Sequence, residues 1–470
     1  MTDTNASKLG LLGLVGVVAG SMIGGAIFAL PSKMAAGAGV GAVIIAWIIT
    51  GIGMFFLANT FSTLAQKRPD LNGGIYDYAN EGFGRFTGFE VAWGYWLSAA
   101  FGNVAFAVLI FEAITYFLPA LGEGGVWPKL LVCSLLIWSM HFLVLRGVGS
   151  AALLNMIATI GKLVPVFVVI VACTVVFNYD VFKVDIWAQN MNLGGLGVQV
   201  KSTMLITLWA FIGIEGAAVI SSRAKSPDLI GKATFIGLAL CLSLYLFISV
   251  LPFGMMHDAE IAALKDPSAA GVFAKIVGPW GAGFVNAGVL ISLLGCWLSW
   301  TILVAEVPYQ AAQEGVFPRS LAQLNANGAP ARSLWMTSIV MQLILMLAML
   351  SSDAFDFLIS ITGVMVLPSY LASAAFLWMI SHDGNKGIGF SIFTGIMGSL
   401  FSLWLLYAAG PAYLMMSTVL FSAGIVIYWM SHDSEGDKPF HGREKFIALG
   451  MVALAAIAIV LFATGRLALS

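Results

Sequence analysis

The stretch that decides the fold is GVVAGSMIGGAIFALP, residues 16–31, which is apolar enough to lie in a lipid bilayer. Four of its sixteen residues are nevertheless glycine, and the last is proline. A glycine inside a helix costs about 1 kcal/mol relative to alanine. Such a segment is therefore either a helix that packs very closely against a neighbour or a helix that is interrupted within the membrane.

The composition of the whole chain is that of an integral membrane protein. Of its 470 residues, 60% are hydrophobic and 10% are charged, whereas a soluble protein carries about 25% charged residues. Apolar runs close to or longer than the roughly 20 residues that cross a bilayer recur along the chain. Because these runs are continuous rather than alternating, they favour helices over a β-barrel. We predict an all-α polytopic membrane protein with about 12–13 transmembrane helices. The predicted spans are residues 9–30, 38–62, 89–118, 128–145, 151–178, 201–221, 233–256, 272–306, 334–350, 356–380, 388–409, 411–430 and 446–465.

The distribution of lysine and arginine predicts the orientation. With the N-terminus inside, the inner segments hold 14 of the 22 Lys and Arg residues and the outer segments hold 7, while Lys162 lies within a span. This excess predicts a cytoplasmic N-terminus. Carboxylates gather on the opposite side, where they either form an outer vestibule that concentrates cations or are ordinary solvated loop charges. These carboxylates are Glu123, Asp180, Asp185, Asp258, Glu260, Asp266, Asp353 and Asp356.

A second glycine-rich segment lies five spans after the first, in TLWAFIGIEGAAVISSRAKSP, residues 207–227. It places Gly213 and Gly216 on either side of Glu215. Two glycine-interrupted spans in corresponding positions indicate an inverted-repeat transporter with its site between the breaks. A carboxylate at this depth is costly, which indicates a function for Glu215, although a hydrogen bond between helices is the alternative.

Several stretches resemble the amino acid, polyamine and organocation transporter superfamily, and within it the basic amino acid/polyamine antiporters. They are GSMIGGAIFALP (20–31), NGGIYDYANEGFG (72–84), TLWAFIGIEGA (207–217) and AAQEGVFP (311–318). The resemblance is strongest to arginine:ornithine antiporters, through AWGYWLSAAFGNVAFAVL (92–109), HFLVLRGV (141–148), STMLITLWAFIGIEGA (202–217) and IVGPWGA (276–282). It covers residues 8–380 and weakens after them.

The resemblance implies a five-plus-five inverted repeat, with one repeat at about residues 9–178 and the other at 201–380. Residues 1–380 would form the transporter core, and residues 381–470 would add peripheral transmembrane helices. A homodimer is a possible assembly.

The resemblance also implies a substrate site between the two breaks. The substrate carboxylate would lie at the start of the second half of span 1, and freed backbone carbonyls of Met22, Trp209 and Ile212 would hold its ammonium group. Related arginine:agmatine antiporters have a serine where this chain has Gly25, so the carboxylate here would depend on backbone amides. The implied substrate-binding residues are Met22, Gly24, Gly25, Ala26, Asn103, Trp209, Ile212 and Trp300.

Within this site, Trp209 and Trp300 would flank a cationic side chain with their ring faces, and Asn103 would hydrogen-bond to it. Lys162 lies in TIGKLVPVF, residues 159–167, where sodium-coupled relatives of this fold bind their ion. It would replace sodium, either as a static tether or as a group that exchanges a proton. Further gating or lining candidates are Glu215, Tyr95, Tyr370 and Phe106.

The implied function is exchange of a cationic amino acid for its metabolic product, with arginine for ornithine as the leading pair. The alternatives are histidine/histamine, lysine/cadaverine and arginine/agmatine exchange, proton-coupled amino acid uptake, and, outside transport by exchange, a channel or nutrient receptor. We expect a bacterial inner-membrane protein that meets lipid and a small-molecule substrate, and no nucleic acid. The sequence has no zinc, phosphate-loop or nucleophile-elbow motif, and its four cysteines fall in or beside spans. We therefore expect neither enzyme activity nor a metal or cofactor.

Overall fold

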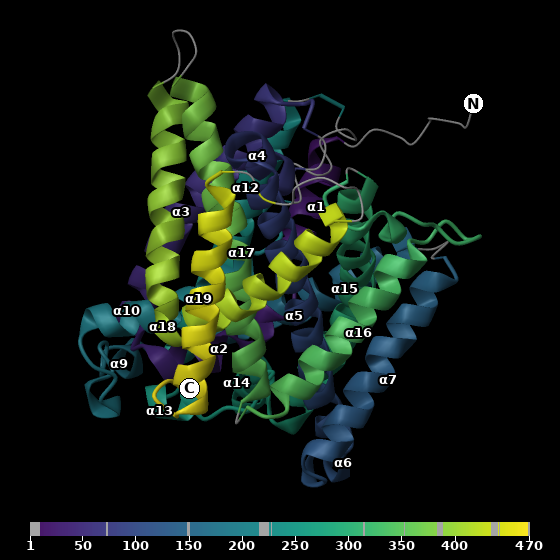
Figure 1. Cartoon of the computed structure of the whole chain (residues 1–470). Coiled ribbons are helices and arrows are strands. Elements are labelled where there is room, and N and C mark those ends of the chain that lie inside the picture. The colour runs from purple at the N-terminus through teal and green to yellow at the C-terminus, as the bar shows by residue number, and fades with distance from the viewer. Residues whose placement is uncertain are drawn as a thin grey trace.

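In the computed structural model, the stretch 16–31 is divided between two helices, α1 (Leu11–Met22) and α2 (Ala26–Gly37), which are bent by 48° relative to each other (Figure 1). The three residues between them, 23–25, interrupt the helix in the middle of the apolar run. Helix α2 continues through Pro31 to Gly37, farther than the predicted end of span 1 at residue 30. The glycines thus accompany an interrupted helix.

The structure describes residues 10–71, 74–147, 151–215, 225–226, 228–313, 315–351, 353–382, 389–433, 440 and 442–468, without the side chains of residues 17, 151–157, 228, 432 and 433. Gly216, which was named above, lies outside this part of the chain. So do four of the 14 Lys and Arg residues that were counted for the inner segments, namely Lys8, Arg223, Lys386 and Lys438.

The described residues form helices and no strand, as the sequence predicted. The remaining helices are α3 (Val40–Lys67), α4 (Ile75–Phe83), α5 (Arg85–Phe117), α6 (Pro119–Glu123), α7 (Val126–Leu145), α8 (Ala151–Val176), α9 (Tyr179–Phe182), η1 (Gln189–Met191), α10 (Leu196–Phe211), α12 (Asp228–Val250), η3 (Leu251–Gly254), α13 (Asp258–Ala262), α14 (Ser268–Val277), α15 (Pro279–Gln313), η4 (Arg319–Leu321), α16 (Ala331–Ala348), α17 (Ala354–His382), α18 (Gly389–Asp433) and α19 (Glu444–Ala463).

Within the described residues, ten helices are long and apolar enough to cross a membrane, or eleven if α1 and α2 count as one span. Two features reconcile this number with the thirteen predicted spans. Helix α18 has 45 residues and turns at Gly410, where φ is 77°, so its two halves supply the predicted spans 388–409 and 411–430. Helix α10 has 16 residues and ends at Phe211, residues 212–215 form a turn, and the rest of its predicted span lies outside the described residues.

One predicted boundary differs clearly from the structure. The span expected at 272–306 is two elements, because Gly278 has a φ of 88° and ends α14, and Pro279 then begins the 35-residue helix α15. Proline is well tolerated in the first turn of a helix, where its missing N–H has no partner to lose.

The bundle has two distinct ends (Figure 1). The short helices α6, α9, α13 and α14 lie at the lower end in this view, which we call the α13 end. Helix α4 lies near the opposite end, which we call the α4 end. Helices α5 and α17, which are largely buried, run through the centre.

Candidate functional site

A small cavity lies beside the break between α1 and α2. All eight residues that the sequence predicted for substrate binding line it, although they come from four separate stretches of the chain, at residues 22–26, 103, 209–212 and 300. Its volume is about 40 Å³, which is room for about three water molecules. In this structure the free space in the cavity is therefore smaller than an amino acid. Its lining is Ser21, Met22, Gly24, Gly25, Ala26, Ser98, Ala99, Gly102, Asn103, Phe106, Trp209, Ile212, Trp300 and Thr362.

The break exposes both kinds of backbone group. The N–H of Gly24 donates to the carbonyl of Met22 at 2.9 Å, so this amide is used within the break itself. The next amides, of Gly25 and Ala26, begin helix α2, and the first amides of a helix have no intrahelical partner. They also lie at the positive end of the helix dipole, which favours an anion such as a carboxylate.

Tyr245 of α12 joins the two interrupted helices, and sequence reasoning missed it. Its hydroxyl lies 2.9 Å from the carbonyl oxygen of Met22 and 2.8 Å from that of Ala210, so it connects the last turn of α1 to the last turn of α10. The side chain is fully buried and stacks on Trp47, with ring centroids 5.8 Å apart. A tyrosine in the middle of a predicted span was the only signal in the sequence.

Lys162 of α8 binds the end of α1. Its Nζ donates to the carbonyl oxygens of Gly20 at 2.7 Å and Ile23 at 2.9 Å, and the residue is 1% exposed. These carbonyls belong to the last turn of a helix, where no amide further along can reach them. The ammonium group of Lys162 thus occupies the position of a cation at the break.

A second contact brings the two breaks together directly. The hydroxyl of Ser21 lies 2.9 Å from the carbonyl oxygen of Gly213 and 2.8 Å from that of Val18. Gly213 has a φ of 108°, and a Cβ atom there would lie 2.8 Å from the carbonyl oxygen of Ser21. Only glycine allows both this backbone conformation and this close approach.

Glu215 is held by groups from three elements. Tyr95 of α5 donates its hydroxyl to Oε1 at 2.8 Å, Tyr370 of α17 donates to Oε2 at 2.7 Å, and the N–H of Gly213 donates to Oε2 at 3.1 Å. Glu215 is 2% exposed. The predicted gating residues Tyr95, Glu215 and Tyr370 therefore form one hydrogen-bonded cluster that ties the break in span 6 to α5 and α17.

Asn103 is a polar side chain of the cavity that can still form hydrogen bonds. It is 1% exposed, and neither its Oδ1 nor its Nδ2 has a hydrogen-bond partner within the described structure. A buried amide without partners costs about 1 to 3 kcal/mol. A ligand that hydrogen-bonds to Asn103 would recover this cost.

The carboxylates at the α13 end are partly brought together. Of the eight predicted there, Glu123, Asp266, Asp353 and Asp356 line one cavity of about 690 Å³. Burial raises the pKa of Asp266 to about 6, even though the nearby charge of Lys33 lowers it. This cavity is distinct from the one at the breaks.

Comparisons with known proteins bear on the family of this chain. The amino acid permease family matches residues 9–430. An arginine/agmatine antiporter of Chlamydia abortus is 47% identical over an alignment that covers 99% of this chain and all of the relative. Proteins of the same name from Chlamydia caviae and Chlamydia pneumoniae are 47% and 46% identical, and the alignments cover 98% and 99% of each chain.

Proposed function

Because this chain belongs to the amino acid permease family, we propose that it exchanges a cationic amino acid for its metabolic product by alternating access. Its N-terminus would lie in the cytoplasm of a bacterial cell, so that the α13 end faces outward. Lys and Arg in the loops support this orientation. The observation that carries the proposal is that one cavity between the two breaks gathers all eight predicted substrate contacts.

The pair that we propose is arginine for agmatine, because the relatives compared above carry that name over nearly their whole length. Arginine for ornithine is the second candidate, and the stretches at residues 92–109 and 202–217 favour it. The two pairs use the site differently: ornithine keeps the carboxylate that the α2 amides would bind, whereas agmatine keeps the guanidinium group and has no carboxylate.

In this site, the amides of Gly25 and Ala26 bind the carboxylate of arginine. Its guanidinium group lies against the rings of Trp209 and Trp300, each of which contributes about 0.5 to 2 kcal/mol, and Asn103 hydrogen-bonds to it. The ring faces select cations as a class. Asn103 adds the discrimination among head groups, because an unpaired hydrogen-bonding group in a dry site is costly.

A counterflow experiment tests this function. Proteoliposomes are loaded with unlabelled arginine, and the entry of labelled arginine is measured in competition with agmatine, ornithine, lysine, histidine and leucine. We expect entry to require substrate on both sides, and agmatine to compete as well as arginine. Equal competition by leucine would contradict cation recognition, and competition by ornithine but not agmatine would select the second pair.

A further inference from the structure

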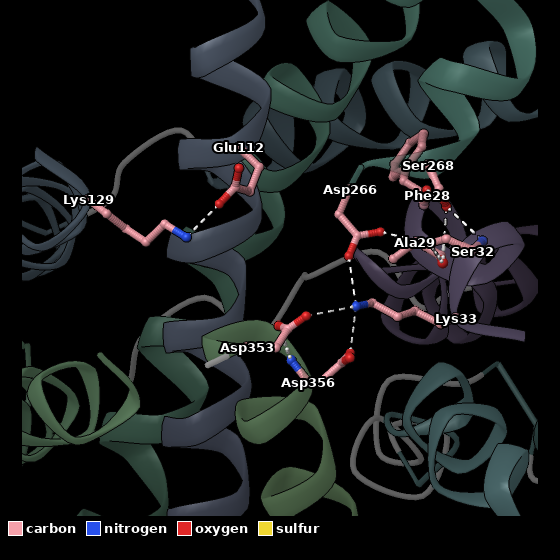
Figure 2. Close-up of polar contacts among 10 residues, drawn as sticks. All are labelled: Phe28, Ala29, Ser32, Lys33, Glu112, Lys129, Asp266, Ser268, Asp353 and Asp356. Atoms are coloured by element: carbon pink, nitrogen blue, oxygen red, sulfur yellow. Dashed lines mark hydrogen bonds and ion pairs between the residues drawn. The ribbon is translucent and has the colours of Figure 1, made fainter. Parts of the chain in front are cut away.

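A cluster of four charged residues lies at the α13 end, outside the site described above (Figure 2). The Nζ of Lys33 in α2 is 2.7 Å from Asp356 Oδ1, 3.1 Å from Asp266 Oδ2 and 3.5 Å from Asp353 Oδ2. Asp266 lies just before α14, whereas Asp353 and Asp356 lie at the start of α17. One cation thus joins three elements that are far apart in the sequence.

The two sides of the cluster are held differently. On one side, the Ser32 hydroxyl donates to Asp266 Oδ1 at 3.1 Å, the Ser32 N–H donates to Ser268 Oγ at 3.1 Å, and the Ser268 hydroxyl donates to the Ala29 carbonyl at 3.2 Å. These hydrogen bonds, together with the ion pair between Lys33 and Asp266, fasten residues 266–268 to α2 (Figure 2). On the other side, Lys33 forms ion pairs with Asp353 and Asp356 at the start of α17.

The side chains of the cluster are also partly exposed to solvent. The Lys33 and Asp266 side chains are 13% and 12% exposed, whereas those of Asp353 and Asp356 are 53% and 45% exposed. Lys33, Asp353 and Asp356 line both the cavity of about 690 Å³ and a second one of about 380 Å³. Water on two sides weakens these ion pairs relative to buried ones, which makes them the joint that can open.

A short chain of contacts leads from the cluster to the central cavity. The Lys33 Nζ lies 5.6 Å from the centre of the Phe355 ring, and this ring makes an edge contact with Trp209, with centroids 5.6 Å apart. Trp209 lines the cavity. Phe355 is 5% exposed, and its two contacts connect the charged cluster to the lining of the central cavity.

We propose that Lys33 and the carboxylates Asp266, Asp353 and Asp356 form the latch of a gate at the α13 end, and that the latch is closed in this structure. Opening breaks the two ion pairs to α17, separates α2 and residues 266–268 from α17, and uncovers Phe355. The central site then becomes reachable from this end. The proposal deepens the exchange function proposed above and rests on it.

The test uses a cysteine reporter in the central cavity. Ala99→Cys places a thiol in the cavity lining, and the four natural cysteines are buried. The rate of maleimide labelling is measured on the purified full-length protein, with and without Lys33→Met, which removes the charge and keeps most of the stem. We expect about tenfold faster labelling in the Lys33 variant, because the open state becomes more populated.

Lys129→Met is the matched control. Lys129 of α7 pairs with Glu112 of α5 at 2.6 Å beside the same large cavity (Figure 2), and within the described residues no ion pair joins either of them to α2 or α17. Its labelling rate should equal that of the parent. Equal rates in the parent and in Lys33→Met, or equal acceleration by Lys129→Met, would overturn the latch. Asp356→Asn leaves Lys33 unchanged and removes one of its ion pairs, and it should also accelerate labelling.

Labelling needs no transported substrate, so the latch and the exchange function can fail separately. Faster labelling in Lys33→Met together with failed counterflow would reject the proposed function and retain the gate. Unchanged labelling together with normal counterflow would reject the latch and retain the function.

Discussion

At the scale of single residues, Lys162 occupies a place that a metal cation could otherwise take. Its ammonium group binds two carbonyls at the end of α1. We predict that exchange proceeds equally in sodium and in choline media. Lys162→Met should slow turnover about tenfold or more while changing substrate affinity less, because the carbonyls lose their cation. Lys183→Met, which removes an exposed lysine paired with Asp180, is the control. Strong sodium dependence of the parent would contradict the prediction.

Tyr245 supports a second residue-scale prediction. Its hydroxyl is the contact between Met22 and Ala210, in a fully buried position. Tyr245→Phe should lower the stability by about 1 to 3 kcal/mol, the cost of leaving a buried carbonyl unpaired. The measurement is the thermal unfolding midpoint of the purified protein. Tyr407→Phe is the control, because that side chain is 63% exposed, and an equal loss there would exclude the bridging role.

At the scale of elements, a glycine in the second break and a glycine inside α1 have different surroundings. Gly213 has a positive φ and meets the Ser21 carbonyl, whereas a Cβ at Gly20 in α1 would have no atom within 4 Å. We predict that Gly213→Ala costs about 1 to 3 kcal/mol of stability and abolishes exchange. Gly20→Ala should be neutral or slightly stabilising, because alanine favours a helix. Thermal unfolding and counterflow of both variants check this, and similar behaviour of the two would show that the glycines act only in packing.

The joint between α2 and α17 is predicted to respond to pH through Asp266. In the closed latch, burial holds the pKa of this carboxyl at about 6, and opening wets it and returns its pKa toward the ordinary value of about 3.9. The closed state therefore binds more protons. Lowering the pH from 7 to 5 should favour closure about tenfold and slow exchange as the pH falls through 6.

The other charges that act on Asp266 are Lys33 and Asp356, and Asp353 pairs with the same lysine. Burial raises the pKa of Asp353, but the charge of Lys33 and hydrogen bonds from backbone amides outweigh it and keep the value below the ordinary one. In Asp266→Asn the pH dependence of exchange should flatten. Asp258→Asn is the matched control, since burial and Asp185 also raise the pKa of Asp258 to about 6, and a flattened profile there would exclude Asp266 as the cause.

At the scale of the whole molecule, the exchanged pair sets the electrical behaviour. Arginine carries one net positive charge near neutral pH and agmatine carries two, so exchange of external arginine for internal agmatine moves one charge outward. A membrane potential changes the free energy of such a step by about 2.3 kcal/mol per 100 mV. We predict that an inside-positive potential in proteoliposomes accelerates this exchange. Insensitivity to the potential would instead favour ornithine, which carries the same charge as arginine.

The sequence predicted those parts of the molecule that leave a local pattern. Glycines within an apolar run indicated the break at residues 23–25, and a carboxylate between glycines indicated Glu215. The contacts of Tyr245 and Lys33 leave no such pattern, because their partners are distant: Tyr245 is 223 residues from Met22, and Lys33 is 320 residues from Asp353. Only the packing of the helices brings these groups together.

The position of the Tyr245 hydroxyl affects how many hydrogen-bond donors the backbone carbonyls have before and after a substrate binds. A hydroxyl has a single hydrogen, yet it lies between two carbonyl oxygens, and Ser21 is placed in the same way. Around the breaks, acceptors thus outnumber the hydrogens that these two side chains supply. A substrate ammonium group brings three hydrogens of its own. The Met22 carbonyl also accepts from the Gly24 N–H, so a substrate ammonium group would add donors chiefly at the carbonyls of Ala210 and Gly213. The substrate itself would then complete the hydrogen bonding between the two interrupted spans.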